Sequence, residues 1–166
     1  MKTQKGFTLI ELLIVIAVIV LIGTMAAVAV SSARSKQRDA TRLSNVRQVQ
    51  SALEDYFNER NSYPAGENLP IGDGAYSACL STIGFLGNCS GEGEIIMRIV
   101  PATFAKGLDS EVTCGAPVRS AFCYTQHSEG LEYYINFELE NSLSQVGLQK
   151  GVNCATPKGI QAGRCK

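Results

Sequence analysis

The stretch that decides the fold is Lys5-Gly6-Phe7-Thr8-Leu9-Ile10-Glu11-Leu12-Leu13-Ile14-Val15-Ile16. It places one carboxylate, that of Glu11, inside a long apolar run that follows a short basic leader. From Leu12 to Ala33 the run has no charged residue, which is long enough for a helix to cross a bilayer. A charge inside such a span costs roughly 2.5–3.5 kcal/mol, so we expect Glu11 to have a partner. Cleavage after Gly6 would create one, because it leaves a new α-amino group on Phe7, about one helical turn away.

The segment Gly6-Phe7-Thr8-Leu9-Ile10-Glu11-Leu12 resembles the class III signal of type IV pilins and of the pseudopilins of type II secretion. In these families a membrane prepilin peptidase cuts after the glycine and methylates the new N-terminal phenylalanine. The resemblance implies cleavage between Gly6 and Phe7 and N-methylation of Phe7. It also implies that Glu11 and Phe7 act in filament assembly, with Glu11 pairing with the N-terminal amine of a neighbouring subunit.

Two other interpretations of this N-terminus remain open. A secretory signal peptide has a basic region, an apolar region of roughly 7–15 residues and a cleavage site with small residues. Lys2 and Lys5 could supply the first, and Ala27-Val28-Ala29 the last. The apolar run is longer than that, however, and it carries Glu11. A plain single-span anchor explains the length of the run but not its carboxylate.

The pattern of apolar residues predicts one continuous helix from the membrane segment to about Asn58. There is no proline between Phe7 and Asn58, and apolar residues recur at steps of three and four after the membrane segment. Tyr63-Pro64 predicts that the helix ends around Asn58 to Asn61. We therefore expect a leader at residues 1–6, a membrane or filament-core half of the helix at 7–33, an amphipathic half at 34–60, and a β-rich head domain at 61–166. The apolar stripe of the amphipathic half comprises Leu43, Val46, Val49 or Gln50, Leu53, and Tyr56 or Phe57.

The remainder of the chain predicts a small antiparallel sheet packed on the helix stripe, an α+β fold that resembles that of type IV pilins. Residues 131–140 alternate apolar and polar side chains, the period of a half-buried strand, and residues 95–100 and 121–125 also read as strands. We expect three or four strands in all. Residues 64–94, rich in glycine, predict a loop-rich connector with one helical turn near 77–83. Residues 145–166 lack periodicity and predict a loop.

Six cysteines follow the helix, and an even number in a small exported domain predicts disulfides rather than a metal site. No two of them form a Cys-x-x-Cys pair, and fifteen connectivities are possible. The spacing favours pairs between neighbours in the sequence. The candidates are Cys79 with Cys89, Cys114 with Cys123, and Cys154 with Cys165.

The net charge and the positions of the basic residues give no sign of nucleic-acid binding. The formal net charge is 0, so no strong field attracts an anionic polymer. A basic band follows the membrane segment, but aromatic residues that could stack on bases are not interleaved with it. We interpret this band as contacting lipid headgroups or acidic groups such as Asp39 or Glu54 of neighbouring subunits. The band comprises Arg34, Lys36, Arg38, Arg42 and Arg47.

Residues suited to catalysis or metal binding are sparse. His127, the one histidine, lies in a polar stretch and is expected to be a solvated loop residue rather than a general base. Asp109 and Glu111 could bind a hard cation, and major pseudopilins bind calcium, but calcium needs roughly six to eight oxygen ligands. We expect no catalytic residues, no metal and no cofactor. We therefore expect that the protein is not an enzyme.

The resemblance implies a structural subunit of a type IV pilus, held in the cytoplasmic membrane by a single span with its head outside and then assembled into an extracellular filament. Its implied partners are other copies of the chain, the prepilin peptidase, the membrane, and the platform protein and motor ATPase of pilus assembly. A pseudopilin of type II secretion is the alternative. Major pseudopilins usually continue past the helix with a Thr-Glu-Gln-Gly-Leu-like segment, whereas Ala65-Gly66-Glu67-Asn68-Leu69-Pro70 stands here. A membrane-anchored exported binding domain is the further alternative.

Overall fold

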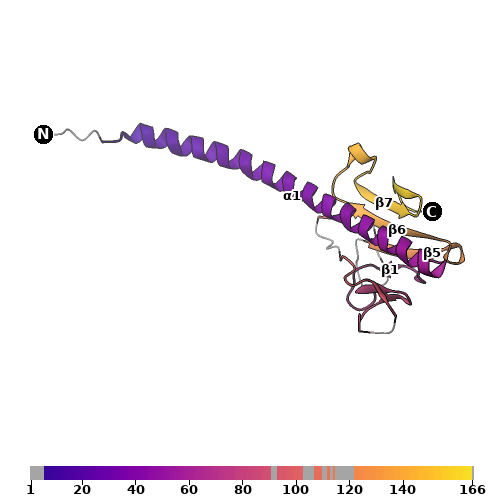
Figure 1. Ribbon diagram of the computed structural model, residues 1–166. Helices are drawn as coiled ribbons and strands as arrows, with labels where there is room; N and C mark the ends of the chain where they lie inside the picture. The colour runs from indigo at the N-terminus through magenta and orange to yellow at the C-terminus, as the bar shows by residue number, and fades with distance from the viewer. Residues whose placement is uncertain are drawn as a thin grey trace. The chain divides into compact units, whose positions relative to one another are not determined.

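A computed structural model describes residues 6–90, 93–102, 107–109, 112, 114 and 122–165. The chain forms two compact units, Met1–Gln37 and Arg38–Lys166. A single helix, α1 (Leu9–Arg60), contributes its first part to the former unit and its second part to the latter (Figure 1).

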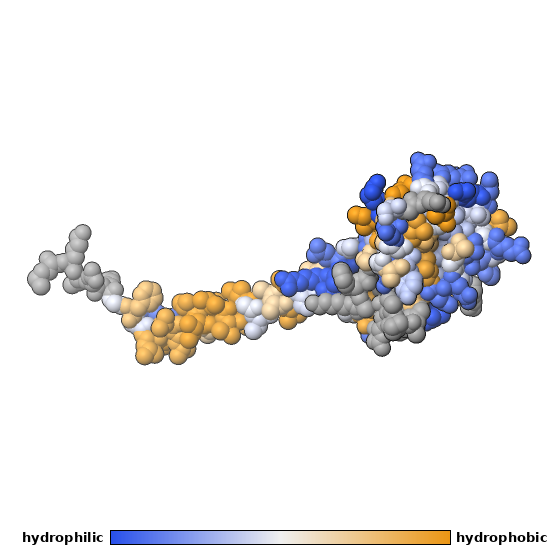
Figure 2. All heavy atoms as spheres, turned by 90° about the horizontal axis from the view of Figure 1, so that it is seen from below, coloured by the Kyte–Doolittle hydropathy of each residue, from blue (hydrophilic) through white to orange (hydrophobic). Residues whose placement is uncertain are grey.

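In the first unit, α1 exposes apolar side chains on every side. Residues 9–34 are all exposed, and Figure 2 shows this part of the helix as an apolar surface. Within the described residues, α1 is the one helix long and apolar enough to cross a membrane, and none of its most apolar window is buried. A helix that is apolar all round is stable only where lipid or other apolar surfaces surround it. This finding and the length of the span fit a membrane-anchored, single-pass protein.

In the second unit, α1 lays one stripe of side chains on the core. Val46, Val49, Leu53 and Tyr56 recur at helical spacing and are all buried. The helix ends at Arg60, as predicted, because Asn61 adopts a left-handed conformation with φ 54° and its amide bonds to the carbonyl of Phe57 at 2.7 Å.

Two antiparallel sheets make up the rest of the described part of the second unit. The larger has the strand order β1-β5-β6-β7-β8, and the smaller has the order β3-β2-β4. The strands of the larger sheet are β1 (Leu69–Pro70), β5 (Phe122–His127), β6 (Glu132–Leu139), β7 (Gly151–Thr156) and β8 (Gly159–Ala162). Those of the smaller sheet are β2 (Cys79–Ser81), β3 (Gly84–Leu86) and β4 (Ile95–Met97), and the short 3₁₀ helices are η1 (Ser128–Gly130) and η2 (Ser144–Val146).

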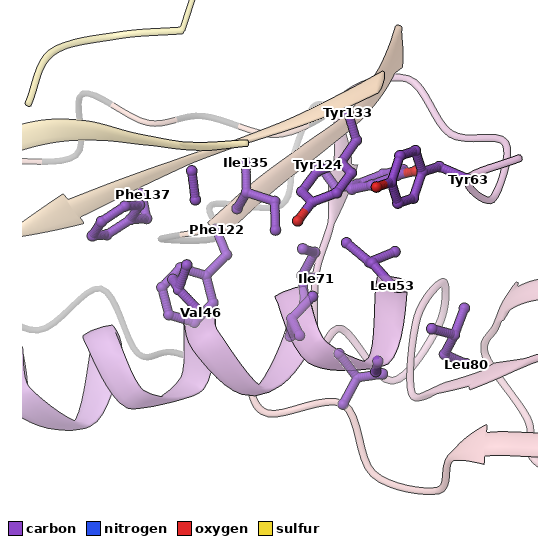
Figure 3. Packing of buried hydrophobic residues seen from close by; sticks show 14 of the residues in the cluster. Val46, Leu53, Tyr63, Ile71, Leu80, Phe122, Tyr124, Tyr133, Ile135 and Phe137 are labelled. Atoms are coloured by element: carbon purple, nitrogen blue, oxygen red, sulfur yellow. The ribbon is translucent and has the colours of Figure 1, made fainter. Parts of the chain in front are cut away.

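The core lies between the second part of α1 and the larger sheet. Tyr133, Ile135 and Phe137 alternate along β6 and point toward the helix, as Figure 3 shows. Register places Phe122 opposite Phe137 and Tyr124 opposite Ile135, so β5 adds its side chains to the same face. The helix stripe and this face form one buried cluster. The predicted α+β fold, with a long N-terminal helix on antiparallel strands, is confirmed.

The expectation of three or four strands and a loop at residues 145–166 is wrong. Strands β7 and β8 form a hairpin there, and β7 pairs along β6 from Ile135 opposite Ala155 to Leu139 opposite Gly151. The period of two is missing from β7 because both of its faces are buried: Ala155 lies in the main core and Val152 in a second cluster on the opposite face. A strand buried on both faces shows no alternation.

The expectation of a helical turn near residues 77–83 is also wrong. Strands β2 and β3 form a tight hairpin in which Ser81 pairs with Gly84. Gly84 has φ 120°, a conformation that side chains disfavour, and this lets the chain reverse there. The expected strand at residues 95–100 is present but shorter, as β4, although the amide of Val100 still bonds to the carbonyl of Ala78 at 2.9 Å.

Candidate functional site

The first site is the start of α1, where Glu11 forms a capping box with Thr8. The Glu11 carboxylate accepts hydrogen bonds from the Thr8 amide at 2.8 Å and from the Thr8 hydroxyl at 2.7 Å. In return, the Glu11 amide donates to the Thr8 hydroxyl oxygen at 3.3 Å. Thr8 directly precedes the first helical residue, Leu9, so these bonds satisfy amides that have no partner in the helix itself.

This arrangement leaves the Glu11 carboxylate able to accept a further donor. Both of its bonds from Thr8 end on the same oxygen, Oε2, and a carboxylate has about four lone-pair sites in total. Phe7 is 85% exposed beside it. Sequence reasoning identified Glu11 and Phe7 but missed Thr8, although the Thr-x-x-Glu spacing of a capping box was visible in Thr8-Leu9-Ile10-Glu11.

The second site is a charged cluster where α1 enters the second unit. Asp39 is fully buried, and four hydrogen bonds of 2.8–2.9 Å satisfy its carboxylate. One donor is Arg42, one helical turn on, and the others are the amide of Glu140 and the amide and side chain of Asn141. Because Glu140 directly follows β6, the cluster ties α1 to the end of the central strand.

The carboxylate of Glu140 completes this cluster. It accepts a two-pronged pair of bonds from the guanidinium of Arg38, at 2.6 and 2.5 Å, and a third from Arg42 at 2.7 Å. The hydrogen bonds from Arg38, and then those from Arg42, hold the pKa of Glu140 below its ordinary value, against the opposing effect of burial. The same contact raises the pKa of Arg38.

The cluster changes the interpretation of the basic band. Asp39 and Arg42 are buried and paired within the chain, so these two residues do not meet lipid or a neighbouring subunit as the sequence led us to expect. Arg38 pairs with Glu140 but keeps 38% of its side chain exposed. These pairs could not be predicted from the sequence because their partner, Glu140, lies about a hundred residues further along the chain. Glu54, the other expected acidic contact, accepts a bond from the Tyr63 hydroxyl at 3.0 Å.

Three disulfides staple the second unit, and they join the cysteines that their spacing favoured. Cys79 and Cys89 have Cα atoms 5.9 Å apart, those of Cys114 and Cys123 are 5.3 Å apart, and those of Cys154 and Cys165 are 5.0 Å apart. Each bridge closes a loop of about ten residues and is worth roughly 2.5–3 kcal/mol in the chain-entropy model.

The remaining candidate residues lie apart from these sites. His127 is the exposed last residue of β5 rather than a loop residue. Asp109 forms an exposed ion pair with Lys150 at 3.5 Å, and its amide bonds to the buried carboxylate of Glu138 at 2.7 Å. Its expected partner Glu111 lies outside the described residues. Among the described residues, no group of three or more metal-ligating side chains comes together.

Comparison with known proteins identifies the N-terminal segment. Residues 1–27 match the family model described as the prokaryotic N-terminal methylation motif. This is the class III signal of type IV pilins and pseudopilins, and it implies processing by a prepilin peptidase. The match covers the leader, the Thr8–Glu11 capping box and the first turns of the apolar helix. No solved structure matches the chain.

Proposed function

We propose that this chain, which carries the class III signal of type IV pilins and pseudopilins, is a structural subunit of a type IV pilus. The observation that carries the proposal is the apolar, fully exposed first part of α1, which begins with a carboxylate held by a capping box. In this proposal residues 1–6 are removed, residues 7–33 pass from the membrane into the filament core, residues 34–60 carry the head, and residues 61–166 complete it. The chain has a structural role and is not an enzyme.

The apolar helix explains how such a subunit can leave the bilayer. Its side chains exchange lipid for the helices of neighbouring subunits, so the hydrophobic cost of extraction is largely offset. The Glu11 carboxylate is the exception, because an ionised group in an apolar core needs a partner of opposite charge. The methylated amine of a neighbouring Phe7 is that partner, and it binds at the carboxylate oxygen Oε1 while Thr8 holds Oε2. Pairing therefore sets the register between subunits.

One feature of the sequence favours a pilus over the pseudopilus of type II secretion. The segment after the helix, Ala65-Gly66-Glu67-Asn68-Leu69-Pro70, departs from the Thr-Glu-Gln-Gly-Leu-like continuation of major pseudopilins. Three disulfides suit an exported head in either case, because the periplasm and the cell exterior are both oxidising. Long filaments sheared from the cell surface would support the pilus, whereas short filaments confined to the periplasm would indicate the pseudopilus.

Mass spectrometry of the protein from native membranes or sheared filaments tests the processing step. We expect a chain that begins with N-methylated Phe7 and is lighter by six hydrogens than its reduced form, as three disulfides require. A chain that still begins at Met1 after exposure to prepilin peptidase would contradict the proposal. A start near Ser31 would instead indicate a cleaved secretory signal and an exported domain of another kind.

Substitution of Glu11 tests the assembly step. Glu11→Gln and Glu11→Ala should insert and fold like the parent chain, because Glu11 lies far from the core of the second unit in sequence, yet should yield few filaments. Electron microscopy of sheared material and the amount of subunit left in the membrane give the readout. Normal filaments from either variant would remove Glu11 from the mechanism.

A further inference from the structure

A notch opens between the last turns of α1 and the outer strand β4 of the smaller sheet. It has a volume of about 350 Å³, near the lower end of the roughly 300–1,000 Å³ of small-molecule pockets, so it suits one long side chain better than a larger ligand. Its apolar wall is the start of β4, and its polar wall is an exposed side of the helix. The residues that line the notch are Asp55, Asn58, Glu59, Glu94, Ile95 and Ile96.

Three carboxylates line the notch without a cation to balance them. Asp55 and Glu59 are one turn apart on the same side of α1, and Glu94 directly precedes β4. Within the described part of the chain, none of these three side chains forms an ion pair or a hydrogen bond. Arg60 and Arg98, the cations nearest to them in the sequence, form no ion pair there either. The notch therefore presents unbalanced negative charge beside an apolar wall.

Arg47, on α1 in the same unit, is a cation without a carboxylate partner among the described residues. Its side chain is exposed. The residues one turn away on either side, Ser44 and Ser51, are short and uncharged, so they neither pair with the guanidinium nor cover its long stem. Asp55 and Glu59 lie about 12–18 Å further along the helix, which is too far for Arg47 to reach the notch of its own chain.

We propose that the notch of one copy of this chain receives the Arg47 side chain of a second copy. A guanidinium carries five N–H donors in one plane, so it can bond to the carboxylates of Asp55 and Glu59 together. The methylene stem of an arginine packs on apolar surface while its head stays among polar groups, and Ile95 and Ile96 provide that surface. Charge and apolar lining therefore select the same partner.

The two halves of this contact lie at different places on one unit, so the contact is heterologous. A copy that inserts its arginine keeps its own notch free for the next copy, and such a contact builds a ring or an open helical filament rather than a closed pair. The contact rests on the proposed function and adds to it a link between heads, whereas Glu11 and Phe7 act between apolar helices. Arg34 and Lys36, the exposed cations that precede Arg47, belong to the first unit and not to the head.

Charge reversal in cells that make filaments tests the contact. Arg47→Glu sets a further carboxylate against the notch of the neighbour, and we expect the yield of sheared filaments to fall about tenfold or more. Asp55→Arg combined with Glu59→Arg should also lower the yield, since two cations then oppose Arg47. All three substitutions together restore opposite charges and should recover most of the parental yield. Glu67→Arg, at an exposed position outside the notch, is the control and should leave the yield unchanged.

A pair of introduced cysteines detects the contact directly. Arg47→Cys combined with Asn58→Cys, which lines the notch, should link copies into a ladder of dimers, trimers and longer chains on a non-reducing gel. The cysteines of the parent chain are all in disulfides already, so the new pair supplies the thiols. Because the contact is heterologous, neither single substitution should give the ladder.

Three outcomes overturn the proposed contact. These are a parental yield from Arg47→Glu, no recovery in a triple variant whose far-ultraviolet circular dichroism matches that of the parent, and no ladder from the cysteine pair. Failure of the proposed function looks different, because the parent chain itself would then form no filaments. A ladder from the cysteine pair in native membranes would still show that the heads associate through the notch.

Discussion

The carboxylate of Asp39, on α1, accepts a hydrogen bond of 2.9 Å from the backbone amide of Glu140, the residue that directly follows β6. This contact joins two segments that are 101 residues apart in the sequence. The two side chains also share a partner, because the guanidinium of Arg42 donates to both. Helix and central strand are therefore held together by charge at this end, in addition to the apolar core between them.

Removal of Asp39 should destabilise the second unit strongly. Asp39→Ala deletes four hydrogen bonds and leaves Arg42, which is 3% exposed, with one carboxylate fewer. Breaking a buried pair in this way costs about 3–5 kcal/mol. Denaturant unfolding of the oxidised full-length protein, followed by tyrosine circular dichroism, measures the change. Asp55→Ala, on an exposed position of the same helix, is the control and should change the free energy of unfolding by less than about 0.5 kcal/mol.

The loss of folding stability at low pH should depend on Glu140. The hydrogen bonds from Arg38 hold the pKa of this carboxyl below its ordinary 4.5 in the folded state. A lowered pKa means that the unfolded chain takes up the proton first, so the stabilisation is complete above pH 4.5 and is lost as the pH falls toward the folded-state value. Glu140→Gln should lower stability at neutral pH and flatten this loss. Unfolding curves at a series of pH values test this prediction. The same fall in the free energy of unfolding at low pH in the parent and in Glu140→Gln would contradict it.

An element with one buried face leaves the clearest pattern in the sequence. The stripe of Val46, Val49 and Leu53 and the alternation along β6 both predicted their elements, because burial on one side leaves a period in the sequence. Strand β7 was hidden because neither of its faces meets water. The hairpin of β2 and β3 was hidden by its length, since three residues per strand carry too little pattern.

The sites divide in the same way. Glu11 stands out because a charge in an apolar run is conspicuous in the sequence alone, and its role in assembly remains a prediction. Arg42 looked like a member of a basic band on the helix surface, and Asp39 like an acidic contact for a neighbouring subunit, since their partner Glu140 comes from a distant segment. Nearest-neighbour spacing did favour the cysteine pairs, because the hairpin of β7 and β8 is itself a local structure.

Loss of the disulfide between Cys154 and Cys165 should have a local and a global effect. Replacement of both residues by alanine reopens a loop of 11 residues, which costs roughly 2.5–3 kcal/mol. The hairpin of β7 and β8 remains, so the protein should still fold. We expect a lower melting temperature and faster hydrogen exchange at the amides of residues 163–165. An unchanged melting temperature would show that the bridge adds nothing to the hairpin.

Thr8 should matter for assembly through the orientation it gives to Glu11. Thr8→Val keeps the shape of the side chain and the backbone amide but removes the hydroxyl, and with it the 2.7 Å bond to Oε2. A hydrogen bond to a charged group is worth about 1.5–3 kcal/mol, so the carboxylate should lose part of its alignment toward the neighbouring amine. Thr8→Ser restores the hydroxyl and is the matched control. Filament yield should then fall in the order Thr8→Ser, Thr8→Val, Glu11→Ala, with leader cleavage unchanged in all three. Parental yields from Thr8→Val would mean that the capping box serves only the start of α1 and takes no part in register.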